Sequence, residues 1–145
     1  MIRRATIHDV YPLTLLFREY VTAVIDKDRK DLPGDIDHMA AILTSPAHFV
    51  VVAVERKRIV GYGHGMVYSG LDGEAVVAVV AVYVADKYRA NGVGKALFES
   101  VLAFGRTRGA TKAETTIPVE YNDTVIKHAG FERKTITYSM AIKGE

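Results

Sequence analysis

The chain has 145 residues, of which 49% are hydrophobic and 25% are charged, and it contains no cysteine. This length and composition predict a single domain over residues 1–145, and they exclude disulfides, thiolate zinc sites and cysteine nucleophiles. The net charge of +2 argues against a dedicated nucleic-acid binder, which would carry a dense basic stripe.

Membrane and export signals are not evident in the sequence. No apolar run reaches the length that spans a bilayer. No apolar segment of a signal peptide follows Arg3 and Arg4. We therefore expect no membrane partner and a cytoplasmic location.

The first third of the chain is predicted to form a short strand and two helices. The strand covers Ile2 to Ala5, and Thr6 then resembles a helix N-cap, with Asp9 as the acid of a capping box. Apolar side chains follow at helical spacing, so the first helix should end near Asp26. The run of charged residues from Asp26 to Asp31 indicates an exposed loop.

A second helix and three strands come next. Asp35 is expected to cap this helix, and Ser45-Pro46 should end it. The third strand is too continuously apolar to have one face in water. The three predicted strands are Phe49 to Val54, Ile59 to Tyr68 and Ala75 to Val84.

Glycines alternate along the second of these strands, at Gly61, Gly63 and Gly65. Since successive side chains point to opposite faces, one face of this strand is bare in its middle. A bare face allows a helix or a ligand to approach closely, and we favour a helix. The other face, with Tyr62 and His64, is a candidate wall of an acceptor site if it faces a cleft.

The last part of the chain is predicted to form two helices and three strands. An amphipathic helix follows a glycine-rich turn and ends near Gly109. A strand from Lys112 to Thr116 and a short helix from Asn122 to His128 come next. Phe131 to Ile142 should form a final pair of strands, which would offer an edge for a homodimer.

The glycine-rich turn before the amphipathic helix is a candidate anion site. Backbone amides at a helix start are unpaired and lie at the positive end of the helix dipole, and Gly92 and Gly94 leave them accessible. A P-loop is excluded, because Arg89 replaces its first glycine and Ala96 its hydroxyl residue. A dinucleotide fingerprint is excluded, because Leu97 stands in place of the third glycine.

The motif R-x-x-G-x-G that remains, in this order of elements, resembles the acyl-CoA motif of the GNAT superfamily of N-acetyltransferases. The similarity covers nearly the whole chain, from Ile2 to Thr6 at the start to Gly130-Phe131 near the end. It implies an α/β (α+β) fold with a central, mostly antiparallel, twisted sheet of about six or seven strands. About four helices would flank this sheet, which would be splayed at the acyl-CoA site.

The resemblance implies acetyl-CoA as the co-substrate. One strand backbone would pair with the pantetheine arm, as a sheet edge accepts an added strand, and the loop amides would hold the pyrophosphate. The residues implied are Val82, Tyr83, Val84, Arg89, Ala90, Asn91, Gly92, Val93, Gly94, Lys95 and Asn122. Asn122 could equally be only a helix N-cap.

The catalytic groups are less clear, because Ile126 stands where many family members have a proton-donating tyrosine. Tyr121 is the nearest replacement acid, with Tyr83 and Tyr138 as rivals. Glu74, at the start of the central strand, could act as a base through water, with Glu120 and His64 as rivals. No metal is expected, because His8, His38, His48 and His128 show no ligand spacing.

The sequence therefore predicts an N-acetyltransferase in which an amine attacks acetyl-CoA directly. The acceptor could be a small molecule or a peptide. The alternative is a catalytically degenerate module that binds acyl-CoA, and Ile126 favours that alternative. A nucleotide-binding protein of another fold is a further alternative, against which the failed phosphate motifs argue.

Overall fold

The computed structural model describes residues 1–117 and 123–142. Its strands are β1 (Ile2–Arg4), β2 (His48–Glu55), β3 (Arg58–Ser69), β4 (Ala75–Val84) and β5 (Lys112–Thr115). Its α-helices are α1 (Val10–Tyr20), α2 (Gly34–Thr44), α3 (Val93–Thr107) and α4 (Thr124–His128). Short helical turns of other types are η1 (Ile7–Asp9), η2 (Val21–Ile25) and η3 (Asp86–Tyr88).

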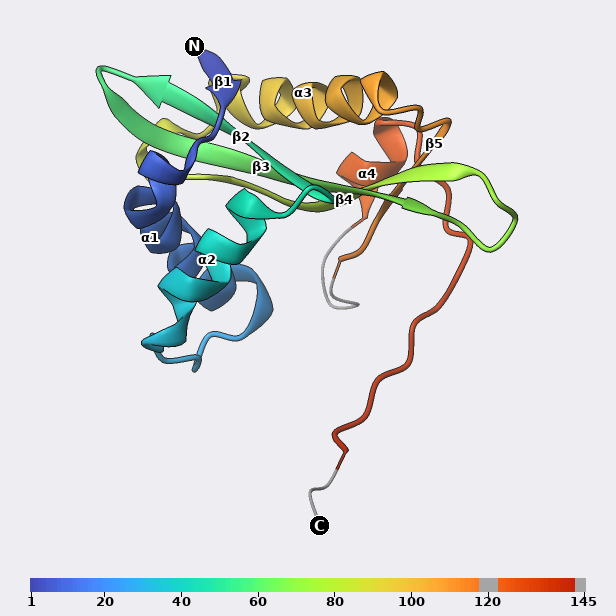
Figure 1. Ribbon diagram of the computed structural model, residues 1–145, viewed down its shortest axis with the longest axis horizontal. Helices are drawn as coiled ribbons and strands as arrows, with labels where there is room; N and C mark the ends of the chain where they lie inside the picture. Colours follow the sequence, from blue (N-terminus) through green and yellow to red (C-terminus); the bar gives the residue numbers. More distant parts are fainter. Residues whose placement is uncertain (118–122, 143–145) are drawn as a thin grey trace.

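The strands form one mixed sheet in the order β1-β2-β3-β4-β5. The first four are antiparallel neighbours, and β5 runs parallel to β4. The helices α1 and α2 cover one face of the sheet, and α3 covers the other (Figure 1). The predicted α/β class, the mostly antiparallel sheet and the four α-helices are confirmed.

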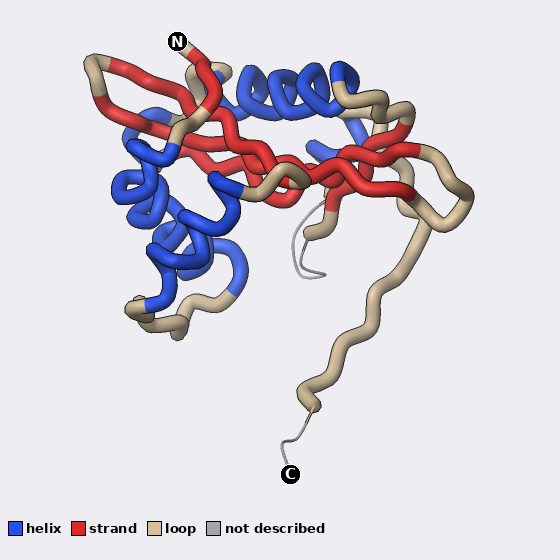
Figure 2. Tube along the Cα trace, in the orientation of Figure 1, coloured by secondary structure: helices blue, strands red, loops and turns tan. Residues whose placement is uncertain are grey.

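Both faces of the central strands are buried, which explains their continuous apolar sequences. In β2, Val50 and Val52 pack with Leu13 beneath the helix pair, whereas Phe49 and Val51 pack on the α3 side. Figure 2 shows the sheet lying between the two helical layers. The sheet therefore separates two apolar clusters and positions the residues of each face.

The bare face of β3 lies against α3, as the alternating glycines predicted. A Cβ added at Gly63 would lie 2.8 Å from Cγ2 of Val101, and one at Gly61 would lie 3.1 Å from Cδ1 of Leu97. Because there is no room for side chains here, α3 can approach the strand closely.

The first helical region also follows the prediction. The Asp9 carboxylate accepts a hydrogen bond from the Thr6 amide at 2.8 Å, as in a capping box. A π-helical turn continues α1 as far as Ile25, close to the expected end.

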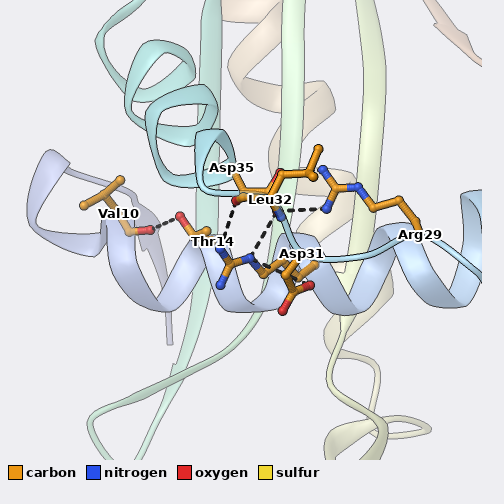
Figure 3. A network of polar contacts seen from close by, with 7 residues as sticks. Val10, Thr14, Arg29, Asp31, Leu32 and Asp35 are labelled. Atoms are coloured by element: carbon orange, nitrogen blue, oxygen red, sulfur yellow. Dashed lines mark hydrogen bonds and ion pairs between the residues drawn. The ribbon is translucent and has the colours of Figure 1, made fainter.

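The predicted capping role of Asp35 is wrong. The helix α2 begins at Gly34, so Asp35 lies inside its first turn, and no side chain caps this helix. Its buried carboxylate instead accepts hydrogen bonds from the Leu32 amide and from the guanidinium groups of Arg18 and Arg29 (Figure 3). Through these hydrogen bonds, Asp35 connects the loop between α1 and α2 to both helices.

The predicted pair of C-terminal strands is also wrong, and the described sheet has five strands rather than six or seven. Residues 131–142 contain no strand and leave the sheet as an extended segment (Figure 1). The apolar residues that suggested a strand, Ile136, Tyr138, Met140 and Ile142, are 60–89% exposed. Their alternation fits an extended chain, but a strand also requires a neighbour to pair with.

Among the described residues, no helix combines the length and the apolar composition that crossing a bilayer requires.

Candidate functional site

One side of β4 is only partly covered by a neighbouring strand. The parallel strand β5 pairs only with the first part of β4, from Val76 to Val79. From Val80 onward, this edge of β4 has no neighbouring strand in the part of the chain that the structure describes. Val80 is also the extra residue of a β-bulge, because the register against β3 shifts between Ala81 and Val79. From Val80 to Val84 this edge therefore has no described strand beside it, although the carbonyl of Val84 accepts a hydrogen bond from the side chain of Arg89.

The glycine-rich turn lies beside the end of this edge. Gly92 has a left-handed conformation with φ of 78°, and a Cβ added there would meet nothing within 4 Å. A Cβ at Gly94 would meet only Cγ2 of Val84, at 3.7 Å. The amides of Val93, Gly94 and Lys95 have no acceptor within α3, because they belong to its first turn. The structure thus places an accessible row of amides next to the free edge of β4.

The half-exposed side chain of Arg89 makes several contacts with the end of β4 and the turn. Its Nε donates a hydrogen bond to the carbonyl of Val84 at 2.9 Å, and its guanidinium is 3.2 Å from the Asp86 carboxylate. The guanidinium also lies 5.2 Å from the centre of the Tyr83 ring. These contacts connect the end of β4 to the start of α3.

The remaining loop residues take different positions. The side chain of Lys95 is 80% exposed, and its Nζ is 3.9 Å from Glu99. Asn91, Gly92 and Val93 line a cavity of about 240 Å³ between the start of α3 and the outer strands. Ala90 adopts a left-handed conformation with φ of 67°.

A larger cavity lies on the opposite face of the sheet, beneath α1 and α2. Its volume is about 470 Å³. Its lining residues are Phe17, Tyr20, His38, Met39, Ala41, Ile42, Ser45, His48, Val50, Tyr62, His64, Val80 and Ala81. The face of β3 that carries Tyr62 and His64 therefore lines a cavity, and this cavity reaches the bulge of β4.

Two histidines in this cavity are hydrogen-bonded to each other. Nδ1 of His48 lies 2.8 Å from Nε2 of His64, so one ring donates a hydrogen to the other. Burial, together with the positive charges that His48 and His38 can carry, lowers the pKa of His64 to about 4. His64 is therefore neutral at pH 7.

The pairing of His48 with His64 could not be read from the spacing of the two residues. His64 lies opposite Val50 in the register of β2 and β3, so it is a diagonal neighbour of His48. The signal present in the sequence was a histidine in each of two apolar strands.

Glu74 is not brought to this site. Glu74 precedes Val80 by six residue steps of extended chain, which corresponds to about 20 Å. Its carboxylate is exposed and lies 3.9 Å from Nζ of Lys112. Of the other sequence candidates, Glu120, Tyr121 and Asn122 lie outside the described residues.

The two remaining tyrosine candidates differ in their surroundings. Tyr83 is a buried residue whose hydroxyl donates a weak hydrogen bond to Glu19 at 3.4 Å, and burial raises the pKa of this hydroxyl. Tyr138 is 88% exposed in the C-terminal segment. Within residues 1–117 and 123–142, no group of three or more His, Asp or Glu side chains could hold a metal ion.

Solved structures with a similar fold include acetyltransferases. The aminoglycoside acetyltransferase meta-AAC0020 from an uncultured soil metagenomic sample, in complex with sisomicin, is 18% identical, with a TM-score of 0.79 over 99% of this chain and 96% of that chain. The ribosomal-protein-alanine N-acetyltransferase from Brucella melitensis biovar Abortus 2308 is 16% identical, with a TM-score of 0.77 over 98% of both chains. The aminoglycoside N-acetyltransferase AAC(6')-Iy in complex with CoA is 18% identical, with a TM-score of 0.76 over 98% of this chain and 95% of that chain.

At these identities the solved structures establish the shared fold. No curated protein sequence matches the chain. The model of the acetyltransferase (GNAT) family, whose members use acetyl-CoA, matches residues 11–131 and so includes α1, the sheet from β2 to β5, α3 and α4. The chain therefore belongs to the acetyltransferase (GNAT) family and is an acyltransferase.

Proposed function

We propose that the protein transfers an acetyl group from acetyl-CoA to an amine, by direct attack of the amine on the thioester. The observation that carries this proposal is the free edge of β4, which begins at Val80 and ends beside the amides of the α3 N-terminus. An extended, amide-containing chain can pair with such an edge, and an anion can bind at such a helix terminus. The pantetheine arm and the pyrophosphate of acetyl-CoA have these two properties.

The proposed acetyl-CoA site combines backbone groups from both elements. The backbone of Val82 to Val84 would pair with the pantetheine arm, and the turn from Ala90 to Lys95 would hold the pyrophosphate. Arg89 would act through its contacts with Val84 and Asp86, which position the turn. Asn122 is proposed from the sequence alone.

The reaction forms a bond between the amine nitrogen and the acetyl carbonyl carbon, and breaks the bond between that carbon and sulfur. Only about one in a few thousand molecules of an ordinary alkyl amine is neutral at pH 7, so a group must accept a proton. The sequence offered Glu74 as the base and Tyr121 as the acid. Glu74 would need a chain of water molecules about 20 Å long to reach Val80, so a nearer base is required.

A module that binds acyl-CoA without turnover is the second candidate. Ile126, which cannot donate a proton, supports it. The two functions differ in the release of free CoA thiol when the full chain is mixed with acetyl-CoA and a panel of primary amines. Amine-dependent thiol release is the expected result. Binding of acetyl-CoA without thiol release from any amine would favour the module.

We propose three further properties, each from its own observation. Residues 1–145 form one domain, because the two apolar clusters share the strands of a single sheet. The protein works in the cytoplasm without a nucleic-acid or membrane partner, as its composition and charge suggest. It forms a homodimer through the exposed apolar row of residues 136–142 and the outer edge of β5.

A further inference from the structure

The cavity beneath α1 and α2 has the size and the lining of a small-molecule site. Its volume of about 470 Å³ lies within the usual range for such sites, which is about 300–1,000 Å³. Aromatic and aliphatic side chains make up most of its wall, with Phe17, Tyr62 and Met39 among them. The described residues that line it include no aspartate, glutamate, lysine or arginine.

Two carboxylates between α1 and the first turn of α2, those of Asp31 and Asp35, lie beside guanidinium groups. Asp35 is bound by Arg18 and Arg29, and Asp31 lies 3.8 Å from Nε of Arg18. Because these carboxylates face guanidinium groups, they are poorly suited to attract a polycation. The cavity therefore favours a ligand whose body is uncharged.

The cavity is also in the right place for an acceptor. Val80 and Ala81 form part of its wall, and Val80 is the bulged residue at which the edge of β4 becomes free. A molecule in the cavity would thus approach β4 from one side, while acetyl-CoA would lie along its edge.

The hydrogen-bonded histidines provide a proton acceptor in this wall. His64 is buried and neutral, and half-buried His48 connects it to the more exposed rim. The other titratable groups that face them are Tyr20 from α1, His38 from α2 and Tyr62 from β3, whereas β4 contributes only Val80 and Ala81. No described carboxylate in the wall competes for the proton.

We propose that this cavity binds the acceptor as a primary amine on an apolar body, aromatic or aliphatic, and that the His48–His64 pair accepts the proton that the amine releases. This inference rests on the acetyl-transfer function proposed above. An apolar wall disfavours the charged ammonium form and so lowers the pKa of the bound amine. The ammonium loses its first proton to His48, whose ring is held by the hydrogen bond to neutral His64, and His48 passes the proton to water. The second proton leaves the nitrogen as the C–N bond forms, and it ends on the thiolate of CoA.

The substrate class is tested by thiol release from acetyl-CoA with two groups of amines. Phenethylamine and hexylamine represent apolar amines, and spermidine and kanamycin represent polycations. The expected kcat/KM is about 100-fold higher for the apolar amines, which corresponds to a preference of about 2.7 kcal/mol. Equal or better use of the polycations, or no turnover of the apolar amines, would overturn the inference.

Thermal unfolding with acetyl-CoA separates this failure from failure of the proposed function. If acetyl-CoA stabilises the protein but apolar amines are not preferred, only the acceptor inference fails. If acetyl-CoA does not stabilise the protein, the acetyl-transfer proposal itself fails.

A positive charge placed in the cavity tests its position. Ala41 lies in the wall on α2, whereas Ala103 is an exposed residue of α3 outside it. Ala41→Arg should raise KM for phenethylamine by about tenfold, because a guanidinium in the wall repels the ammonium form of the amine, with the effect of acetyl-CoA on stability unchanged. Ala103→Arg is the matched control and should leave KM unchanged. Equal KM values in the two variants would contradict the assignment.

The proton acceptor is tested by His64→Gln and His48→Gln, with His8→Gln as an exposed control. Loss of the base should lower kcat by about 100-fold at nearly constant KM, and it should remove the acid limb of the pH profile. His48 is only half-buried, so His48→Gln keeps the test valid if His64→Gln fails to fold. A kcat for His48→Gln within about threefold of the parent, with an unchanged pH profile, would overturn the assignment.

Discussion

Asp35 links three parts of the N-terminal half through one carboxylate. It is 3% exposed and is held by Arg18, Arg29 and the Leu32 amide (Figure 3). These donors keep the pKa of the carboxyl well below its usual range. Because the carboxylate is preferred in the folded state, its contribution to stability is present at neutral pH and is lost on acidification.

Replacing Asp35 should therefore destabilise the fold. Asp35→Asn leaves two guanidinium groups without their shared partner, and the expected loss in free energy of unfolding is about 3 kcal/mol. Asp37→Asn, at an exposed position on the same helix, should change it by less than about 0.5 kcal/mol. Urea unfolding at pH 7 measures both, and similar values for the two variants would refute the role of Asp35.

His64 makes a second contribution to pH dependence, of the same sign as that of Asp35, through its neutral form. Its pKa is about 4 in the folded protein against 6.5 in the unfolded chain, so the unfolded chain binds more protons between these values. Stability should rise as pH increases from 4 to 6.5, by at most about 3 kcal/mol from this group. His64→Gln should show a smaller rise than the parent in thermal unfolding at pH 4.5 and pH 7. An identical rise would show that His64 does not titrate in this way.

At the scale of elements, local patterns predicted most boundaries. The strand from Ala75 to Val84 has the predicted ends, because its long β-branched run lies between a glycine-containing turn and the glycine-rich turn. The same kind of pattern failed for residues 131–142, because alternation does not show whether a partner strand is present.

The contact of α3 with β3 gives a prediction about packing. A methyl group at Gly63 would lie 2.8 Å from Val101 and 3.2 Å from Val51, so Gly63→Ala should cost about 1–3 kcal/mol in stability. Gly34→Ala is the matched control, since nothing lies within 4 Å of its added Cβ, and it should be neutral or stabilising. Differential scanning calorimetry of both variants measures this. A neutral Gly63→Ala would contradict the close approach of the helix.

Only part of the candidate site could be predicted from the sequence, because local patterns do not show which distant segments meet. Val82 to Val84 and the turn at Gly92 could be found because a motif of contiguous residues marks them. The cavity could not, because its wall combines side chains from α1, α2 and three strands. Bringing His48 next to His64 requires the register of β2 against β3, which no local pattern encodes.

For the whole molecule, the C-terminal segment carries a row of exposed apolar side chains. Tyr138 and Met140 are 88% and 85% exposed, and the outer edge of β5 has no strand beside it in the described residues. A second copy can cover both, so the protein should sediment as a dimer. Tyr138→Asp should shift it to the monomer, whereas Ser139→Asp, in the alternate row, should not. A parent protein that is monomeric in sedimentation velocity would contradict the dimer.

The central claim is that the edge of β4 and the start of α3 together bind acetyl-CoA. Thermal unfolding with and without acetyl-CoA, with NAD and ATP for comparison, tests it most directly. A ligand at 100 times its Kd stabilises by about 2.7 kcal/mol, or about 5–10 °C for a domain of this size.

The account predicts such a shift with acetyl-CoA alone, and its loss in Gly92→Glu. Gly109→Glu, which has the same left-handed conformation at the far end of α3 and also lies in open space, should keep the shift. No shift with acetyl-CoA, an equal shift with NAD or ATP, or an unchanged shift in Gly92→Glu would contradict the claim.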